Sequence, residues 1–248
     1  MATEKIIYKK PDSLTDKNFT YCWGCGHSTV HKLIAEIVDE LGIRETLIAV
    51  APVGCAVFAY DFWDFDVTEA AHGRAPVVAT AIKRVHPDKT VFCYQGDGDL
   101  ASIGMAEIIH TANRGENITV IFINNTNYGM TGGQLAPTSL INQVTTTSPK
   151  GRDVKSYGYP IRVSELLAPL EGVKYLERVK VTDAASVIKA KKALKKALMN
   201  QINNVGFSMV EVLASCPANW RKDPIQSNEM IDKEISDYYK LGVIKDEK

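Results

Sequence analysis

The sequence predicts an α/β fold in which a mostly parallel sheet is flanked by helices. Short apolar runs rich in β-branched residues alternate along the chain with longer segments whose apolar residues recur at helical spacing. Strands that alternate with helices form right-handed βαβ units, and hence a parallel sheet. The length of 248 residues, of which 45% are hydrophobic, suits one domain with a sizeable core.

The elements follow from apolar spacing and breaker residues. A first helix is predicted from His27 because apolar residues recur at helical spacing, and Gly42 marks its end. Segments with strand character are 47–53, 91–94, 118–123, 175–181 and 207–213. Further helices are predicted at 76–85, 100–113 and 183–202. The stretch 126–160 is rich in Gly, Thr, Ser and Pro, which predicts a long ordered loop with room for one helical turn.

Composition divides the chain into three parts. Residues 1–20 are polar and irregular and are predicted to form an N-terminal arm. Residues 21–220 are expected to form a single domain. Residues 221–248 are predicted to form a polar C-terminal tail.

Charge and hydropathy limit the class of partner. Lys and Arg number 29, as do Asp and Glu, so no nucleic-acid or membrane-surface partner is expected. The first residues lack the apolar region of a signal peptide, and no run of about 18 apolar residues occurs. The five cysteines favour thiol or metal chemistry over disulfides. A cytoplasmic location is expected.

Segments with chemically functional side chains follow four of the predicted strands. They are Gly54-Cys55, Gly96-Asp97-Gly98-Asp99, Asn124-Asn125 and Cys216-Pro217. In parallel sheets, ligands bind outside the carboxyl ends of the strands. The sequence therefore predicts one binding site at one edge of the sheet.

The segment Gly96-Asp97-Gly98 has the character of a phosphate and Mg²⁺ site. Glycines let backbone N–H groups approach a phosphate, and a helix N-terminus favours its charge. The Asp97 carboxylate, the Asn125 side chain and the Asn127 carbonyl are oxygen ligands of the kind that Mg²⁺ prefers. Taken alone, the motif is as readily a tight turn in which Asp97 caps a helix. Asn125 after the next strand favours the cofactor site.

The cysteines divide into four in predicted loops and one in a strand. Cys22 and Cys25 form a C-x-x-C motif, whereas Cys55 and Cys216 are isolated in sequence. Four thiolates suit a [4Fe–4S] cluster or a structural zinc ion. Structural zinc sites usually pair two short-spaced motifs, so the wide spacing favours a cluster. Cys93 lies in an apolar strand and is expected to be a buried small hydrophobic residue.

As a set, these motifs resemble a known family. They are CWGCGH, VGC, HGRA, GDGD, NN, YGMTGGQ and SCP. The set extends from Cys22 to Trp220 and resembles the β (thiamine diphosphate-binding) subunit of the 2-oxoacid:ferredoxin oxidoreductases. Those enzymes oxidatively decarboxylate a 2-oxoacid, transfer the acyl group to coenzyme A and reduce ferredoxin. The family more often has Pro where Trp23 stands, a change that removes no ligand.

The resemblance implies a thiamine diphosphate-binding fold, Mg²⁺ and a proximal [4Fe–4S] cluster. The implied cluster ligands are Cys22, Cys25, Cys55 and Cys216. The expected cofactor-binding residues are Gly24, Cys25, His27, Gly96, Asp97, Gly98, Asp99, Asn125, Tyr128, Gly129, Met130 and Thr131. His27 at a helix start has a second interpretation, a bond to the backbone. His72 and Arg74 are expected to contact phosphate or the substrate carboxylate, with a surface turn as the alternative.

The chain offers poor candidates for the glutamate that activates the aminopyrimidine ring of the cofactor. Glu69 and Glu107 lie in or beside segments assigned to the diphosphate side. The resemblance places this glutamate on an α-type subunit and adds a ferredoxin-like subunit and ferredoxin as partners. The substrates would be coenzyme A and a 2-oxoacid. The resemblance of the segments TTTSPKGRDV and GYPI implies a branched-chain acid such as 2-oxoisovalerate, with pyruvate and 2-oxoglutarate left open.

Two other functions are compatible with these residues. One is a non-redox thiamine diphosphate decarboxylase or carboligase subunit with a zinc ion, and the other is an iron–sulfur electron-transfer module without catalysis. Two further groups are expected to be structural. Trp63 is expected to take part in packing or in a subunit interface, and the lysines of one helix are expected to form a solvated face: Lys191, Lys192, Lys195 and Lys196.

Overall fold

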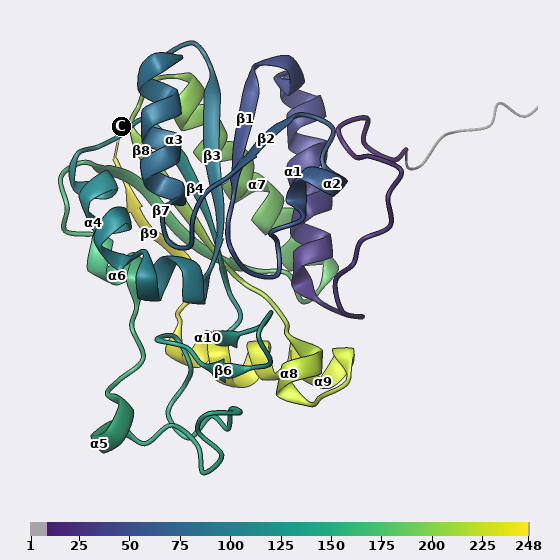
Figure 1. The fold of residues 1–248 in the computed structure, drawn as a ribbon, viewed down its shortest axis with the longest axis vertical. Coiled ribbons are helices and arrows are strands. Elements are labelled where there is room, and N and C mark those ends of the chain that lie inside the picture. The colour runs from purple at the N-terminus through teal and green to yellow at the C-terminus, as the bar shows by residue number, and fades with distance from the viewer. Residues whose placement is uncertain (1–8, 248) are drawn as a thin grey trace, which may run out of the picture.

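The described part of the chain, residues 9–247 of a computed structural model, forms a seven-stranded sheet with helices on both faces (Figure 1). The strand order is β2-β1-β3-β4-β8-β7-β9. Every neighbouring pair is parallel except β7 and β9, which are antiparallel. The predicted fold class is confirmed.

The strands of this sheet are β1 (Leu47–Ala51), β2 (Asp66–Glu69), β3 (Thr90–Gly96), β4 (Thr119–Asn124), β7 (Val173–Lys180), β8 (Phe207–Leu213) and β9 (Gly242–Asp246). A small separate hairpin consists of β5 (Asn127–Tyr128) and β6 (Gln134–Leu135). The central strands lie within a few residues of the predicted positions. The edge strands β2 and β9 were not predicted, because their residues are largely exposed or half-buried and give no apolar run.

The helices are α1 (Gly26–Leu41), α2 (Ala59–Phe62), α3 (Ala75–Val85), α4 (Met105–Asn113), α5 (Val154–Tyr157), α6 (Val163–Leu167), α7 (Ala184–Ile202), α8 (Pro217–Trp220), α9 (Pro224–Met230) and α10 (Ser236–Tyr238). Local chemistry sets the ends of the long ones. Gly42 ends α1 in the left-handed conformation, and the capping box of Asp183 and Ser186 begins α7. The predicted helix 100–113 is divided into a π-helical turn, Asp99–Ile103, followed by α4.

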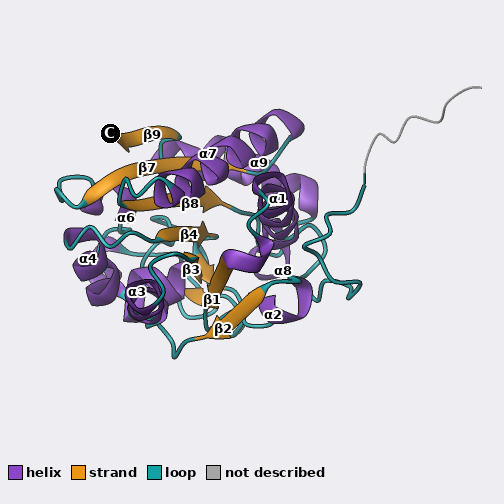
Figure 2. Ribbon diagram, turned by 90° about the horizontal axis from the view of Figure 1, so that it is seen from above, coloured by secondary structure: helices purple, strands orange, loops and turns teal. Residues whose placement is uncertain are grey.

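Two hydrophobic layers enclose the sheet. Helices α1 and α7 pack on one face, while α3, α4 and α6 pack on the other (Figure 2). Cys93 is fully buried in the second layer, and Trp63 packs in the first, where it stacks on His31 with ring centroids 4.2 Å apart. Both structural expectations for these residues are confirmed.

The predicted solvated face of α7 is corrected in part. Lys191 pairs with Glu36 at 2.6 Å and Lys195 pairs with Glu40 at 2.8 Å, so both lysines fasten α7 to α1. Lys196 pairs with Asp246 of β9. These contacts occupy three of the four lysines.

Residues 221–248, predicted to be a polar tail, are folded where the structure describes them. They form α9, a π-helical turn (Ile231–Ile235), α10 and strand β9. Ile231, Ile235 and Tyr239 are buried together, and β9 pairs with β7. The helices and the strand of this segment were not predicted, because its apolar residues are few and are separated by charged ones. Of the predicted N-terminal arm, residues 1–8 lie outside the described part, and Leu14 is buried against the core.

Successive strands are added to the sheet on one side of β1 and then on the other, so the sheet has a switch point between β1 and β3. Strand β2 lies on one side of β1, whereas β3 and β4 lie on the other. Such a switch point leaves a crevice at the carboxyl ends of the strands, where ligands bind in open α/β sheets. Within residues 9–247, no helix combines the length and apolar character needed to cross a bilayer.

Candidate active site

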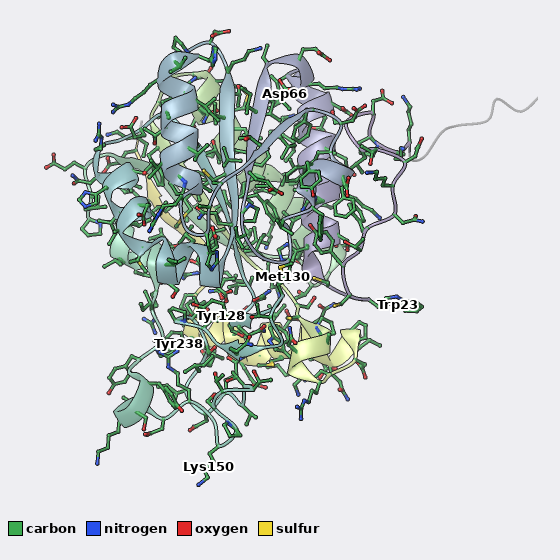
Figure 3. The ribbon with its side chains drawn as sticks, in the orientation of Figure 1. Trp23, Asp66, Tyr128, Met130, Lys150 and Tyr238 are labelled. Atoms are coloured by element: carbon green, nitrogen blue, oxygen red, sulfur yellow. The ribbon has the colours of Figure 1, made fainter. Side chains whose placement is uncertain are left out.

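A cavity of about 210 Å³ lies at this switch point. Segments that follow β1, β3 and β4 line it, as the sequence predicts. The predicted site residues that line it are His27, Cys55, His72, Gly96, Asp97, Gly98, Asp99, Asn125, Asn127, Tyr128, Gly129, Met130 and Thr131. Figure 3 shows Tyr128 and Met130 at the lower end of the sheet, on the same side as the hairpin β5–β6 of Figure 1.

Asp97 is a buried carboxylate at the end of β3. It accepts hydrogen bonds from the Thr138 hydroxyl at 2.7 Å and from the Gly98 N–H at 3.0 Å. Burial raises the pKa of Asp97 to about 7, although these bonds lower it. No Lys, Arg or His side chain of residues 9–247 pairs with Asp97. A buried carboxylate without a cationic partner favours a bound cation.

Asn125 supplies a second oxygen beside Asp97. Its Oδ1 is buried and has no hydrogen-bond partner among the described residues. The neighbouring Asn127 is also buried, and its Nδ2 donates to the Asn125 carbonyl at 2.9 Å. The unpaired Oδ1 and the Asp97 carboxylate are hard oxygen donors that line one cavity, and this donor set fits Mg²⁺.

Gly98 is required by the ring of Tyr128. A Cβ atom at position 98 would lie 2.3 Å from the Tyr128 ring, so that any larger residue would have to displace this side chain. This contact joins the two segments, after β3 and after β4, that line the cavity.

Asp99 holds His72 at the cavity. Its Oδ1 accepts hydrogen bonds from His72 Nδ1 at 2.6 Å and from the Gly73 N–H at 2.8 Å, and its Oδ2 accepts one from Gln95 at 2.6 Å. The carboxylate of Asp99 is therefore engaged by protein groups. With Nδ1 bonded, Nε2 is the nitrogen of His72 that remains to act on a ligand.

Arg74 does not line the cavity. It pairs with Glu107 of α4 and donates to the Ile103 carbonyl at 3.3 Å. The structure thus brings His72 to the cavity and directs Arg74 to the surface of α3 and α4.

His27 lies in the first turn of α1 and lines the cavity. Its Nδ1 is 2.8 Å from the Tyr94 hydroxyl, and the Tyr21 ring stacks on it at 5.0 Å. Burial lowers the pKa of His27 to about 4, which keeps the ring neutral at pH 7. Among the described residues its partner is this hydroxyl, which excludes the expected alternative of a backbone bond.

Of the four loop cysteines, Cys55 is the one that lines the cavity among the described residues. Cys22 is exposed, Cys25 and Cys216 are buried, and Cys55 is half-buried. The pKa of Cys25 and of Cys55 is raised to about 12, mainly by burial, and the charges of the other three cysteines contribute to the rise for Cys25. Within residues 9–247, no three His, Cys, Asp or Glu side chains converge as closely as a bound metal ion requires.

Gly129 connects the cysteines to the oxygen ligands. A Cβ atom at this position would lie 3.0 Å from Cys55 Sγ, 3.7 Å from Cys216 Sγ and 3.5 Å from Asn125 Nδ2. Both cysteine sulfurs and the Asn125 amide therefore meet at one backbone position of the loop after β4.

Sequence reasoning missed three supporting residues. Thr138 bonds to Asp97, Asn219 bonds to Cys216, and Glu211 accepts a 2.8 Å hydrogen bond from Asn124. Thr138 and Asn219 carry no motif of their own. Glu211 is a carboxylate inside the apolar strand β8, a signal that could have drawn attention to it.

Comparisons with known proteins agree with this geometry. A family model described as "Thiamine pyrophosphate enzyme, C-terminal TPP binding domain" matches residues 53–212. The 2-oxoglutarate synthase subunit KorB of Methanocaldococcus jannaschii is 36% identical over 79% of this chain and 69% of its own length. The chain is a β subunit of the 2-oxoacid:ferredoxin oxidoreductase family.

Two further relatives of this 2-oxoacid:ferredoxin oxidoreductase subunit are informative. The ketoisovalerate oxidoreductase subunit VorA of Methanothermobacter thermautotrophicus is 46% identical over 98% of the chain, which spans 53% of that relative. A solved 2-oxoglutarate:ferredoxin oxidoreductase from Magnetococcus marinus superimposes with a TM-score of 0.77 at 25% identity, covering 98% of this chain and 87% of that one. The matched thiamine pyrophosphate domain includes Asp97 and Asn125, whereas Cys22, Cys25 and Cys216 lie outside it.

Proposed function

We propose that this chain binds thiamine diphosphate, Mg²⁺ and a [4Fe–4S] cluster within an enzyme that oxidatively decarboxylates a 2-oxoacid to an acyl-CoA and reduces ferredoxin. The main support is that Cys55, Cys216 and Asn125 all lie within 4 Å of where a Cβ atom of residue 129 would stand, because this proximity joins a cluster site to a cofactor site. When bound, thiamine diphosphate supplies the electron sink for decarboxylation, and the cluster accepts the electrons.

The residues of the cavity have separate tasks in this proposal. Asp97, Asn125 and Asn127 would hold Mg²⁺, and Gly96, where a Cβ atom would meet nothing within 4 Å, would leave room for the diphosphate. The loop residues Tyr128, Met130 and Thr131 would cover the diphosphate.

Among the described residues, His72 is the one proposed to exchange a proton with the substrate. Asp99 fixes its orientation through Nδ1, and the ring lines the cavity. This arrangement leaves Nε2 to donate to, or accept from, a substrate oxygen.

The cysteine set fits a cluster in donor type. Thiols are the ligands of [4Fe–4S] clusters, and Cys22, Cys25, Cys55 and Cys216 influence one another electrostatically. Ligation needs thiolates, so the raised pKa values mean that cluster assembly releases protons.

The activating glutamate is proposed to come from a partner subunit. Among the described residues, none of those lining the cavity is a glutamate. Glu107 pairs with Arg74, and Glu69 is exposed at the end of β2. The isolated chain should therefore fail to reduce a viologen dye with a 2-oxoacid, and an α-type subunit should restore the reaction.

The cavity favours a 2-oxoacid with an apolar side chain. Its described lining includes Val53 and Ala56 but no lysine or arginine that could pair with a second carboxylate. The 46% identity to a ketoisovalerate oxidoreductase subunit supports a branched-chain acid. The assembled enzyme should have a higher kcat/KM with 2-oxoisovalerate than with 2-oxoglutarate.

Electrons are proposed to leave near Cys22. Cys22 is the exposed member of the set, and Trp23 beside it is 93% exposed and projects from the ribbon in Figure 3. Trp23 shares a shallow surface depression with Arg221 and Lys222. An exposed tryptophan with two cations suits an acidic electron carrier such as ferredoxin.

The change Asp97→Ala tests the cofactor site. The assembled enzyme should lose bound thiamine diphosphate but keep its iron, because Asp97 contacts none of the four cysteines through a hydrogen bond among the described residues. Asp66→Ala, on exposed β2, is the matched control. Retention of the cofactor by Asp97→Ala would remove Asp97 from the site.

A further inference from the structure

Asn219 lies between a cysteine of the proposed cluster and the loop that covers the cavity. Its Nδ2 donates to Cys216 Sγ at 3.3 Å and to the Gly129 carbonyl at 2.8 Å. Helix α8 sets the position, since Asn219 follows Cys216 within one turn and the Trp220 N–H bonds to the Cys216 carbonyl at 3.0 Å. An amide nitrogen carries two hydrogens, so both are used in this bridge.

The surroundings fix the orientation of the Asn219 side chain. A Cβ atom at Gly133 would lie 2.8 Å from the Asn219 Cβ, and Gly133 has a φ of +79°. A glycine at position 133 therefore makes room for the Asn219 side chain against the covering loop. The Trp220 indole donates to the Asn125 carbonyl at 3.2 Å, a second bond between α8 and the loops of the cavity.

Asn219 is distinguished by its contact with sulfur. Among residues 9–247, it is the side-chain N–H donor that bonds to a cysteine of the set. The other bond of Cys216, to Asn127 Oδ1 at 3.7 Å, requires the thiol hydrogen and is lost when the sulfur binds iron. The Asn219 bond needs no such hydrogen and is compatible with a ligating thiolate.

We infer that Asn219 is a positioning residue that raises the reduction potential of the cluster through its N–H bond to Cys216, and that joins this ligand to the cofactor loop at Gly129. This inference rests on the proposed function. A reduced cluster carries one more negative charge than an oxidised one, so a hydrogen bond to its sulfur stabilises the reduced state more.

The test is a redox titration of the assembled enzyme, followed by electron paramagnetic resonance. The signal of this cluster is identified as the one that Cys55→Ser abolishes. Asn219→Leu has a similar shape but no N–H, and it should lower the reduction equilibrium constant about tenfold, which is about 59 mV for one electron. Asn219→Asp adds a negative charge and should lower it further.

A matched control and a second readout accompany the titration. Asn228→Leu on the neighbouring helix α9 removes an amide that bonds to the Thr182 carbonyl at 3.2 Å, and it should leave the potential unchanged. An exchangeable proton coupled to the cluster should be visible by double resonance in the unchanged enzyme and lost in Asn219→Leu.

The outcomes separate the inference from the proposed function. Lack of the Cys55-dependent signal in the unchanged enzyme would refute the cluster itself. A signal whose potential is the same in Asn219→Leu as in the unchanged enzyme would overturn the role of Asn219. If Asn219→Leu lost its iron, an unchanged potential in Asn219→Asp would overturn it equally.

Discussion

The Thr138 hydroxyl donates a hydrogen bond of 2.7 Å to Oδ2 of Asp97, 41 residues earlier in the chain. Behind it, the Tyr239 hydroxyl donates to the Thr138 carbonyl at 2.7 Å. Tyr239 is fully buried and lies in the segment that the sequence presents as a tail. The carboxyl-terminal segment thus supports the proposed Mg²⁺ ligand from outside the motif.

The first prediction concerns Thr138→Val. The valine keeps the shape of the side chain but removes the bond to Asp97, and a hydrogen bond to a charged group contributes roughly 1.5–3 kcal/mol. We expect Mg²⁺ affinity, titrated in the presence of thiamine diphosphate, to fall by about tenfold or more. Thr80→Val, whose hydroxyl bonds within α3, is the control. Equal affinities in both variants would show that Thr138 does not support the site.

The second prediction concerns His31 and the pH dependence of stability. Burial holds the pKa of His31 well below its usual value of about 6.5, whereas the unfolded chain takes up a proton near 6.5. The stability is therefore complete above pH 6.5 and is lost as the pH falls below it. His27 behaves in the same way, so both histidines contribute.

Urea unfolding at pH 7.5 and 5.5 measures this effect. The loss of unfolding free energy between the two pH values should be smaller by about 1.4 kcal/mol in His31→Gln. His86→Gln, at an exposed position, serves as the control and should match the unchanged chain. An undiminished loss in His31→Gln would mean that His31 does not carry this dependence.

The third prediction concerns a buried ion pair beneath Asn124. Arg178 and Glu211 are both fully buried, 2.8 Å apart, and Glu211 also accepts the bond from Asn124. Arg178→Met leaves the Glu211 charge unpaired and should lower the unfolding free energy by about 3–5 kcal/mol. Adding Glu211→Leu should restore much of this loss. A double variant as unstable as the sum of the two single variants would contradict the coupling.

The fourth prediction concerns Trp23 as a contact for the electron carrier. Trp23→Ala should raise the KM for ferredoxin while dye reduction is preserved, because a small dye needs no docking surface. Val85→Ala, 72% exposed on α3, is the control for loss of an exposed apolar side chain. A ferredoxin KM that is equal in Trp23→Ala and in the unchanged enzyme would exclude Trp23 from the docking surface.

Much of the fold was predictable because the buried strands are recognisable in the sequence as short apolar runs. Strand β8 was predicted at both boundaries, since Phe207–Leu213 is an apolar run bounded by breakers. The edge strands β2 and β9 give no such signal, because half of an edge strand faces solvent. Helix α6 (Val163–Leu167) was missed because one turn is too short for a helical period.

The site was predictable where function imposes a motif. Asp97, Asn125 and Cys55 line the cavity as their positions after strands imply. The support behind them was not predictable, because Thr138 and Asn219 approach from distant segments through single hydrogen bonds. Arg74 was predicted to be a site residue but does not line the cavity. Its pairing with Glu107 depends on how α3 packs on α4, which the sequence motif does not show.

The most direct test of the central claim is a paired analysis of metal and cofactor in the assembled enzyme, purified anaerobically. We predict bound thiamine diphosphate and an iron content that falls by about four atoms per chain in Cys216→Ser. The iron content should be unchanged in Cys93→Ser, because the Cys93 side chain is fully buried in the hydrophobic layer between the sheet and helices α3, α4 and α6. Zinc in place of iron, iron without thiamine diphosphate, or full iron in Cys216→Ser would contradict the account.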